Sequence, residues 1–131
     1  MAPRKRTIEA IAALAEPVLS DQQRGDFDEG RSLFNAGSYW HAHESWERVW
    51  LAMGNDAGDD AEIILRGLIQ LAAALHLSGI GRMEGAMSNF RKSAEKLAIV
   101  PPGFLGIDIP ALVRFIRARQ TEDRSIAPPP I

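Results

Sequence analysis

The stretch that decides the fold is residues 27–50, which read FDEGRSLFNAGSYWHAHESWERVW. Large apolar residues recur in it at intervals of three and four, which is the spacing of one face of an α-helix. Gly37 interrupts the pattern, and glycine readily adopts the left-handed conformation that ends a helix. We therefore expect a helix over Asp26–Ala36, a tight corner, and a second helix that Ser38 caps and that continues to about Met53.

Helical periodicity continues along the rest of the chain, and strand-length runs of alternating polar and apolar residues are absent. We predict an all-α fold, a bundle of about six helices built on two αα-hairpins. A single domain spans residues 1–131, with an ordered core at about 7–120 between a flexible basic tip and a proline-rich tail that is disordered or extended. The other helices are expected at Thr7–Leu19, from Asp59 or Asp60 to Ser78, at Arg82–Ile99 and from Asp108 to about Gln120.

A weak internal repeat supports the two hairpins. Sliding the chain by 44 residues pairs Phe27 with Leu71, Leu33 with Leu77, Gly37 with Gly81, Ala42 with Ala86 and Trp46 with Phe90. Any two αα-hairpins share small residues at the corner and large ones inside, so coincidence is the alternative explanation. Tandem hairpins resemble tetratricopeptide-like arrays, which keeps a protein-binding surface among the candidate functions.

Composition excludes several functions. Lys and Arg number 15 against 17 Asp and Glu, so the net charge is -2 and no positive field gathers phosphates; a nucleic-acid partner is not expected. The chain has no cysteine, which excludes disulfides, thiolate zinc sites and cysteine nucleophiles. Any metal ion must therefore be held by His, Asp or Glu.

Neither a membrane span nor a secretory signal is expected. The longest charge-free stretch, Gly67–Gly81, is shorter than the roughly 20 apolar residues that a span needs. The apolar run Ala10–Ala15 is short for a secretory signal, which has about 7 to 15 such residues. We expect a cytoplasmic protein.

The helix that begins at Ser38 carries the most informative polar side chains. At about 100° per residue, His43 shares the inner face and Glu47 lies one turn later at its margin. A His and a Glu at this spacing approach closely enough to share a metal ion or a proton. The opposite side should be solvated and carries His41, Ser45 and Arg48.

The next long helix places Arg66 and Gln70 on an otherwise apolar face. Because a buried charge without a partner costs several kcal/mol, we predict that these two side chains face His43 and Glu47 across the helix pair. His76, on the flank of the same helix, can join as a third metal ligand.

Three interpretations of this polar cluster remain open. It can be a structural network, in which Arg66 pairs with Glu47 and His43 bonds to Gln70. It can be a metal site of His43, Glu47 and His76, with Glu44 as a further ligand, or it can line a ligand pocket. The zincin motif HExxH is absent, because Glu47 stands where the second His would be.

Three tryptophans fall within eleven residues of the same helix. Trp46 and Trp50 are a core pair by their position. Trp40 lies at the boundary of the inner face near Glu44, where it can line the rim of a pocket or an oligomer contact.

These residues carry a family resemblance. The pattern Phe27-x-x-Gly30-x-x-Leu33-Phe34-Asn35-x-Gly37-x-Tyr39-x-x-Ala42-His43-Glu44-x-Trp46-Glu47-x-x-Trp50, followed by Gly67–Ala74 and by Gly85-Ala86, resembles domain-of-unknown-function family 309 of bacteria and archaea. Members are small helical bundles, and some are described as predicted metal-dependent hydrolases. The resemblance implies that His43, Glu44 and Glu47 form the family's His-Glu-x-x-Glu core and that Asn35 and Gln70 are its other polar positions. Arg66 stands where the family commonly has Gln, which puts a positive charge near any bound cation.

Two functions follow as expectations. In an enzyme, His43 and Glu47 hold a divalent zinc, iron or manganese ion, Glu44 is the general base on its water, and Gln70 or Arg66 orients an oxyanion. The alternative is a non-catalytic helical scaffold or interaction module in which the cluster is structural. A groove rimmed by Trp40 and the loop 54–58 then binds a small-molecule or protein partner, or forms a homodimer.

Overall fold

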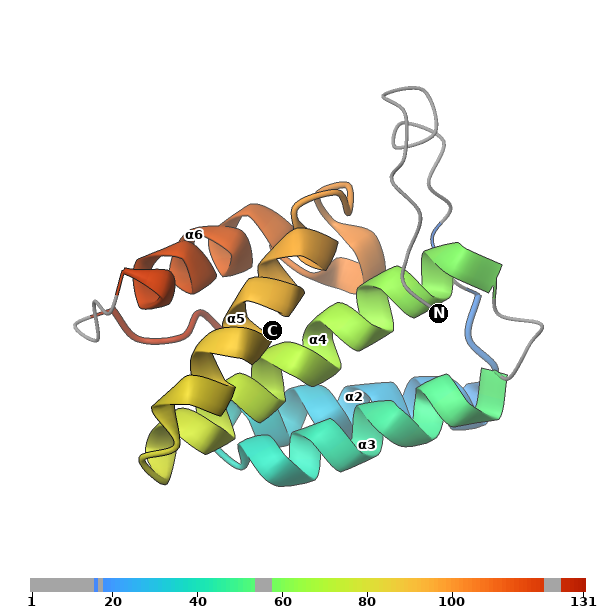
Figure 1. Cartoon of the computed structure of the whole chain (residues 1–131). Coiled ribbons are helices and arrows are strands. Elements are labelled where there is room, and N and C mark those ends of the chain that lie inside the picture. The colour runs from blue at the N-terminus through green and yellow to red at the C-terminus, as the bar shows by residue number, and fades with distance from the viewer. Residues whose placement is uncertain (1–15, 17, 54–57, 122–125) are drawn as a thin grey trace.

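The chain folds into helices that pack on one another in chain order (Figure 1). A computed structural model describes residues 16, 18–53, 58–121 and 126–131. The α-helices in these ranges are α2 (Asp21–Asn35), α3 (Tyr39–Met53), α4 (Gly58–Gly79), α5 (Met83–Leu97) and α6 (Ile109–Gln120), with a 3-10 turn, η2 (Phe104–Gly106), before α6. The all-α prediction is confirmed, with five helices rather than six among these residues. Of the first predicted helix, Thr7–Leu19, residues 7–15 and 17 lie outside the described residues.

Helix α2 begins five residues earlier than predicted, because a capping box starts it. The Ser20 Oγ accepts a hydrogen bond from the Gln23 N–H at 3.1 Å, and the Gln23 Oε1 accepts one from the Ser20 N–H at 2.9 Å. At the other end of the chain, α6 begins directly after Asp108, where the start of a helix was predicted. There the Asp108 Oδ1 accepts from the Ala111 N–H at 3.1 Å.

The 44-residue repeat describes two hairpins, α2–α3 and α4–α5, with matching corners. Gly37 and Gly81 have φ of 81° and 80°, the left-handed conformation predicted for Gly37. At each corner the residue after the glycine donates its N–H to the carbonyl five residues earlier, at 2.8 Å and 2.9 Å. The paired inner positions are buried in both hairpins: Ala42 and Ala86, Trp46 and Phe90. One hairpin geometry is thus used twice.

Helix α4 is the centre of the bundle, between α3 and α5 (Figure 1). Its buried side chains come from nearly every side: Ile63, Ile64, Leu65, Leu68, Leu71, Ala72, Ala74 and Leu75. Among the described residues, Glu62–Gly79 is the one segment long and apolar enough to cross a membrane, and 50% of it is buried inside the bundle. The core helix of a soluble protein has the same properties.

The α2–α3 interface is built around Trp46, which is fully buried. Its indole N–H donates to the Phe27 carbonyl at 3.1 Å, and its ring packs against Phe27 and Phe34. Gly30 makes this approach possible, since an added Cβ would lie 2.3 Å from the indole nitrogen.

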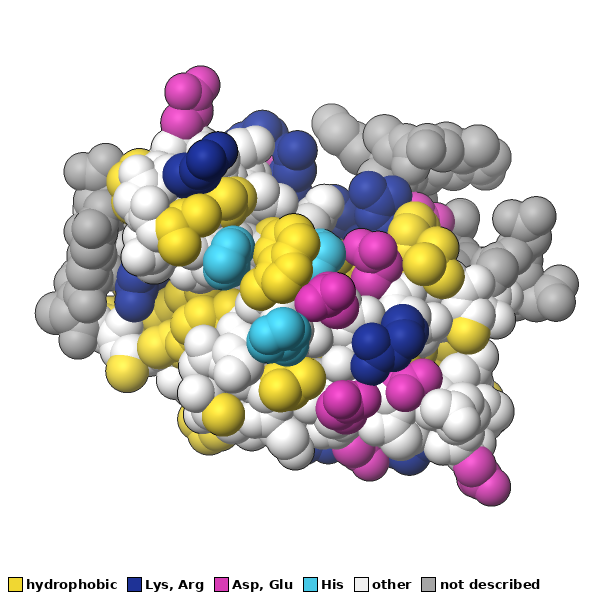
Figure 2. Space-filling model, turned by 90° about the horizontal axis from the view of Figure 1, so that it is seen from below, with side chains coloured by type: hydrophobic (Ala, Val, Ile, Leu, Met, Phe, Trp, Pro, Cys, Tyr) yellow, Lys and Arg dark blue, Asp and Glu magenta, His cyan; other side chains and the backbone are white. Residues whose placement is uncertain are grey.

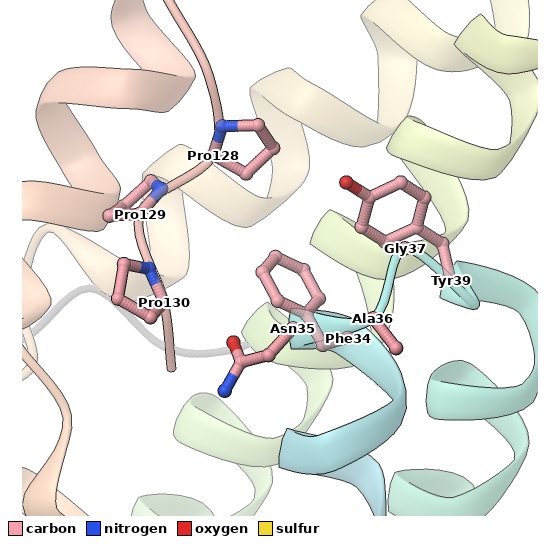
Figure 3. A pocket seen from close by; sticks show the side chains of 8 residues that line it. All are labelled: Phe34, Asn35, Ala36, Gly37, Tyr39, Pro128, Pro129 and Pro130. Carbon is pink, nitrogen blue, oxygen red and sulfur yellow. The ribbon is translucent and has the colours of Figure 1, made fainter.

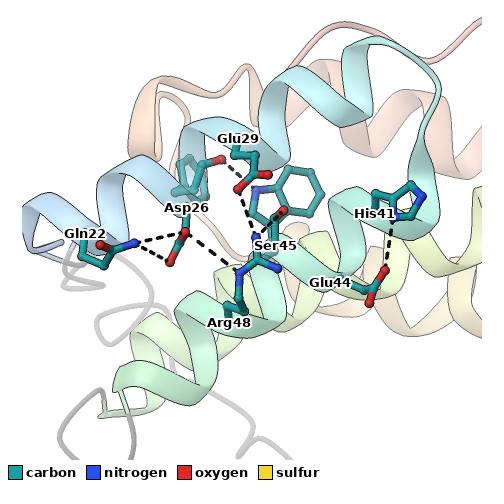
Figure 4. Close-up of polar contacts among 9 residues, drawn as sticks. Gln22, Asp26, Glu29, His41, Glu44, Ser45 and Arg48 are labelled. Atoms are coloured by element: carbon teal, nitrogen blue, oxygen red, sulfur yellow. Dashed lines mark hydrogen bonds and ion pairs between the residues drawn. The ribbon is translucent and has the colours of Figure 1, made fainter.

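Helix α2 also covers a side of α3 that was expected to face solvent. Ser45 is buried there, and the Arg48 guanidinium donates to the Ser45 Oγ at 3.1 Å and to Glu29 on α2 at 3.0 Å (Figure 4). The expectation of a solvated Ser45 was wrong, because helical angle alone does not show where a second helix packs. His41 and Arg48 are exposed, as predicted.

The segment Ile126–Ile131 is not helical and returns to the end of α2. Its final residue, Ile131, is buried against the core. The tail was predicted to be disordered or extended, and that prediction did not include this contact.

Candidate functional site

An exposed tryptophan marks the candidate site. Trp40, at the start of α3, is 46% exposed. Its ring stacks on the His43 ring, with centroids 4.7 Å apart and planes at 15°, and lies 5.1 Å from the His76 ring near the end of α4. Figure 2 shows a hydrophobic side chain between two histidines on this face, with acidic side chains beside them. We call Trp40, His43, Glu44, Glu47 and His76 the Trp40 site.

His43 lies at the margin of the core, stacked against Trp40, rather than inside the core. Its side chain is 16% exposed, and its Nε2 is 3.5 Å from the Glu47 carboxylate one turn later. Its Nδ1 is buried and has no hydrogen-bond partner among the described residues. The predicted His43–Glu47 pair is therefore present, at the edge of an accessible surface.

Two carboxylates follow Trp40 along the same helix, Glu44 one turn later and Glu47 two turns later. Glu44 is half-exposed and lies 3.3 Å from the Nδ1 of the exposed His41 (Figure 4). Glu47 is exposed to a similar degree. Helix α3 thus presents an aromatic ring and two negative charges within two turns.

Arg66 and Gln70 do not join this site. The Arg66 Nη1 is 3.1 Å from Glu62 on its own helix, and its guanidinium lies over the Trp50 ring at 5.4 Å. Gln70 accepts a hydrogen bond from the Lys96 ammonium of α5 at 2.8 Å. The predicted contact of this pair with His43 and Glu47 was wrong. A glutamate one turn away already pairs with the arginine, and the amide reaches α5 instead of α3.

The donor set does not fit a metal centre of three protein ligands. Among the residues that the structure describes, no three His, Asp, Glu or Cys side chains are grouped so that they could hold an ion. His43 and Glu47 supply two donors, whereas the ring of His76 is in contact with Trp40. Catalytic zinc sites use three protein ligands and an open position. No hydrolytic step through a metal follows from this geometry.

The surroundings of Arg66 and Gln70 lower the pKa of Lys96. Burial lowers the pKa of the Lys96 ammonium from its ordinary 10.5, and the positive charge of Arg66 lowers this pKa further, against an opposing effect of Glu95. The unfolded chain then binds more protons than the folded chain between the lowered pKa and 10.5. Protonated Lys96 therefore destabilises the fold at neutral pH, and stability from this group rises as the pH increases through its folded pKa.

Replacing Arg66 should raise the pKa of Lys96. We expect nuclear magnetic resonance titration of the Lys96 side chain to give a pKa below 10.5 in the native chain and a higher one in Arg66→Gln. Arg91→Gln is the control, because Arg91 pairs with Glu95 on the exposed side of α5. A native Lys96 that titrates at or above 10.5 contradicts the partly buried position of its ammonium beside Arg66.

Comparison with known proteins confirms the resemblance seen in the sequence. Residues 27–89 match the model of DUF309, a domain of unknown function. The match runs from α2 into α5 and includes every residue of the Trp40 site. No curated protein matches the chain.

Proposed function

We propose that residues 27–89, which match the DUF309 family model, form a non-catalytic interaction module whose Trp40 site binds a positively charged helix of a partner protein. The observation that carries this proposal is the exposed Trp40, which contacts two histidine rings beside two half-exposed carboxylates.

Trp40 has the properties of a binding anchor. Tryptophan is enriched at interface positions where truncation of the side chain to alanine causes the largest losses of binding affinity. Here the indole is supported by ring contacts with His43 and His76, so it loses little conformational freedom when a partner covers it. A large aromatic side chain that is both exposed and supported favours a recognition role.

The charges around Trp40 favour a cationic partner. Glu44 and Glu47 provide two half-exposed carboxylates that can accept charge-assisted hydrogen bonds from Lys or Arg. A cation over the indole face gains a further attraction from the ring's quadrupole. The same surface would repel an acidic ligand.

The shape of the site favours a helix. Residues 40, 44, 47 and 51 are spaced by four, three and four, so they form one stripe along about 16 Å of α3. Leu51, at the far end of this stripe, is 63% exposed. A fitting partner helix carries apolar side chains at both ends of its contact and Lys or Arg between them.

A second copy of the chain fits this surface less well. In an antiparallel pair of α3 helices, the tryptophan of one copy would meet the leucine of the other, and the two pairs of glutamates would face each other. Like charges in an interface cost several kcal/mol. The cationic partner is therefore preferred to the homodimer, which was one of the alternatives that the sequence left open.

The proposal is tested by titrating the full chain with a synthetic amphipathic helix that has leucines at its ends and lysines between them. We expect Trp40→Ala to weaken binding by about thirtyfold, which corresponds to a loss of about 2 kcal/mol of binding free energy. The double variant Glu44→Gln, Glu47→Gln should also weaken it. Glu95→Gln removes an exposed carboxylate on α5 and should leave the affinity unchanged.

Three results would contradict the proposal. The first is equal binding of the lysine peptide and a glutamate version of it. The second is a dimer in sedimentation that Trp40→Ala abolishes, which would make a second copy the occupant. The third is stoichiometric zinc, iron or manganese in untagged protein that His43→Ala removes, which would favour the metal-dependent hydrolase.

A further inference from the structure

Asn35, the last residue of α2, binds the backbone of Ile131 in both directions. Its Nδ2 donates to the Ile131 carbonyl at 3.0 Å, and the Ile131 N–H donates to its Oδ1 at 2.8 Å. An amide side chain that pairs with both groups of one residue imitates a neighbouring strand, so it recognises an extended backbone rather than a particular side chain.

A pocket of about 450 Å³ lies between this contact and the α2–α3 corner (Figure 3). Phe34, Asn35 and Tyr39 line one side, and the prolines at 128–130 line the other. The Phe34 and Tyr39 rings meet edge to face, with centroids 5.2 Å apart. The tail thus runs along an aromatic wall and leaves open space beside it.

The tail has the sequence of a segment that stays extended. Three consecutive prolines fix their own φ angles, and each residue that precedes a proline is restricted to extended conformations. Such segments lose little entropy when they bind, and aromatic-lined grooves are their usual docking sites. Ile131 follows the prolines and is only 6% exposed, so it anchors the segment in the core.

We propose that Phe34, Asn35 and Tyr39 form a recognition site for an extended proline-rich peptide, and that Ile126–Ile131 of the same chain lies on this site with its prolines lining the opposite side of the pocket. A partner protein with a proline run followed by an aliphatic residue binds there when the tail is displaced. The tail competes at an effective concentration in the millimolar range, so it masks the pocket. This inference concerns different side chains from the Trp40 site and does not depend on the proposed function.

The test uses the 131-residue chain with its tail weakened by Ile131→Asp and Pro129→Gly. The probe is an acetylated synthetic peptide with the sequence of Ile126–Ile131. We expect the peptide to bind the tail-weakened chain about tenfold or more tightly than the native chain, because the weakened tail competes less well for the site. Adding Asn35→Ala should abolish this gain, whereas adding Gln22→Ala, an exposed amide on the same helix, should not. Equal binding to the native and tail-weakened chains, or no binding to either, overturns the proposal.

A second measurement needs no tail variant. In the native chain the Ile131 amide should be protected from hydrogen exchange, because it donates to Asn35. Asn35→Ala should increase its exchange rate by about tenfold or more, as expected when a hydrogen bond of roughly 1.4 kcal/mol is lost. An Ile131 amide that exchanges at the rate of a free peptide in the native chain overturns the proposal that the tail lies on the recognition site, even if the tail variants fail to fold.

Discussion

Replacing Trp46 with alanine is expected to lower the free energy of unfolding by about 3–5 kcal/mol. The indole is fully buried between α2 and α3, where its ring packs against Phe27 and Phe34. The substitution leaves a cavity and removes the hydrogen-bond donor of the buried Phe27 carbonyl. Urea denaturation followed by circular dichroism measures the change.

Trp40→Ala is the matched control, because it makes the same substitution six residues earlier on the same helix. Since Trp40 is half-exposed, we expect its replacement by alanine to lower the free energy of unfolding by less than about 1 kcal/mol. An equal loss in the two variants would show that the assignment of one tryptophan to the core and the other to the surface is wrong.

Gly30→Ala should destabilise the protein by about 1–3 kcal/mol, although alanine favours helices more than glycine does. The new Cβ would lie 2.3 Å from the Nε1 of Trp46 and 2.5 Å from its Cδ1. The indole is buried and hydrogen-bonded, so it can move aside only by disturbing the α2–α3 interface. Thermal and urea unfolding both report this loss.

Gly25→Ala on the same helix is the control for this prediction. A Cβ at Gly25 meets no atom of the described residues within 4 Å, so the substitution should stabilise the chain by about 0.4–1 kcal/mol through helix propensity alone. If Gly30→Ala is as stable as Gly25→Ala, the close approach of Gly30 to Trp46 does not exist in solution.

Local sequence pattern was sufficient to predict most of the fold. Apolar spacing predicted the described helices, and Gly37 predicted the first corner. The 44-residue repeat paired Gly37 with Gly81, which has the same left-handed conformation. The early start of α2 was missed, because its first turn has no apolar side chain and depends on the Ser20–Gln23 capping box. That box is a recognisable signal in the sequence.

The candidate site was only partly predictable. The spacing of His43 and Glu47 on one helix was enough to predict their contact. The partners of Arg66 and Gln70 depend on how α4 is rotated about its axis relative to α3 and α5. The spacing of apolar residues in the sequence does not determine that rotation. The contact of Asn35 with Ile131 joins residues 96 positions apart and has no local signal.

The proposed function is tested most directly by following the backbone and indole N–H resonances of the isotope-labelled chain while the lysine peptide is added. We predict that the shifts centre on Trp40, Glu44 and Glu47 of α3 and on His76 of α4, and that the indole signal of Trp40 moves while that of the buried Trp46 does not. Shifts that centre away from α3, or an unchanged Trp40 indole at saturating peptide, would contradict the assignment of the Trp40 site as the partner-binding surface.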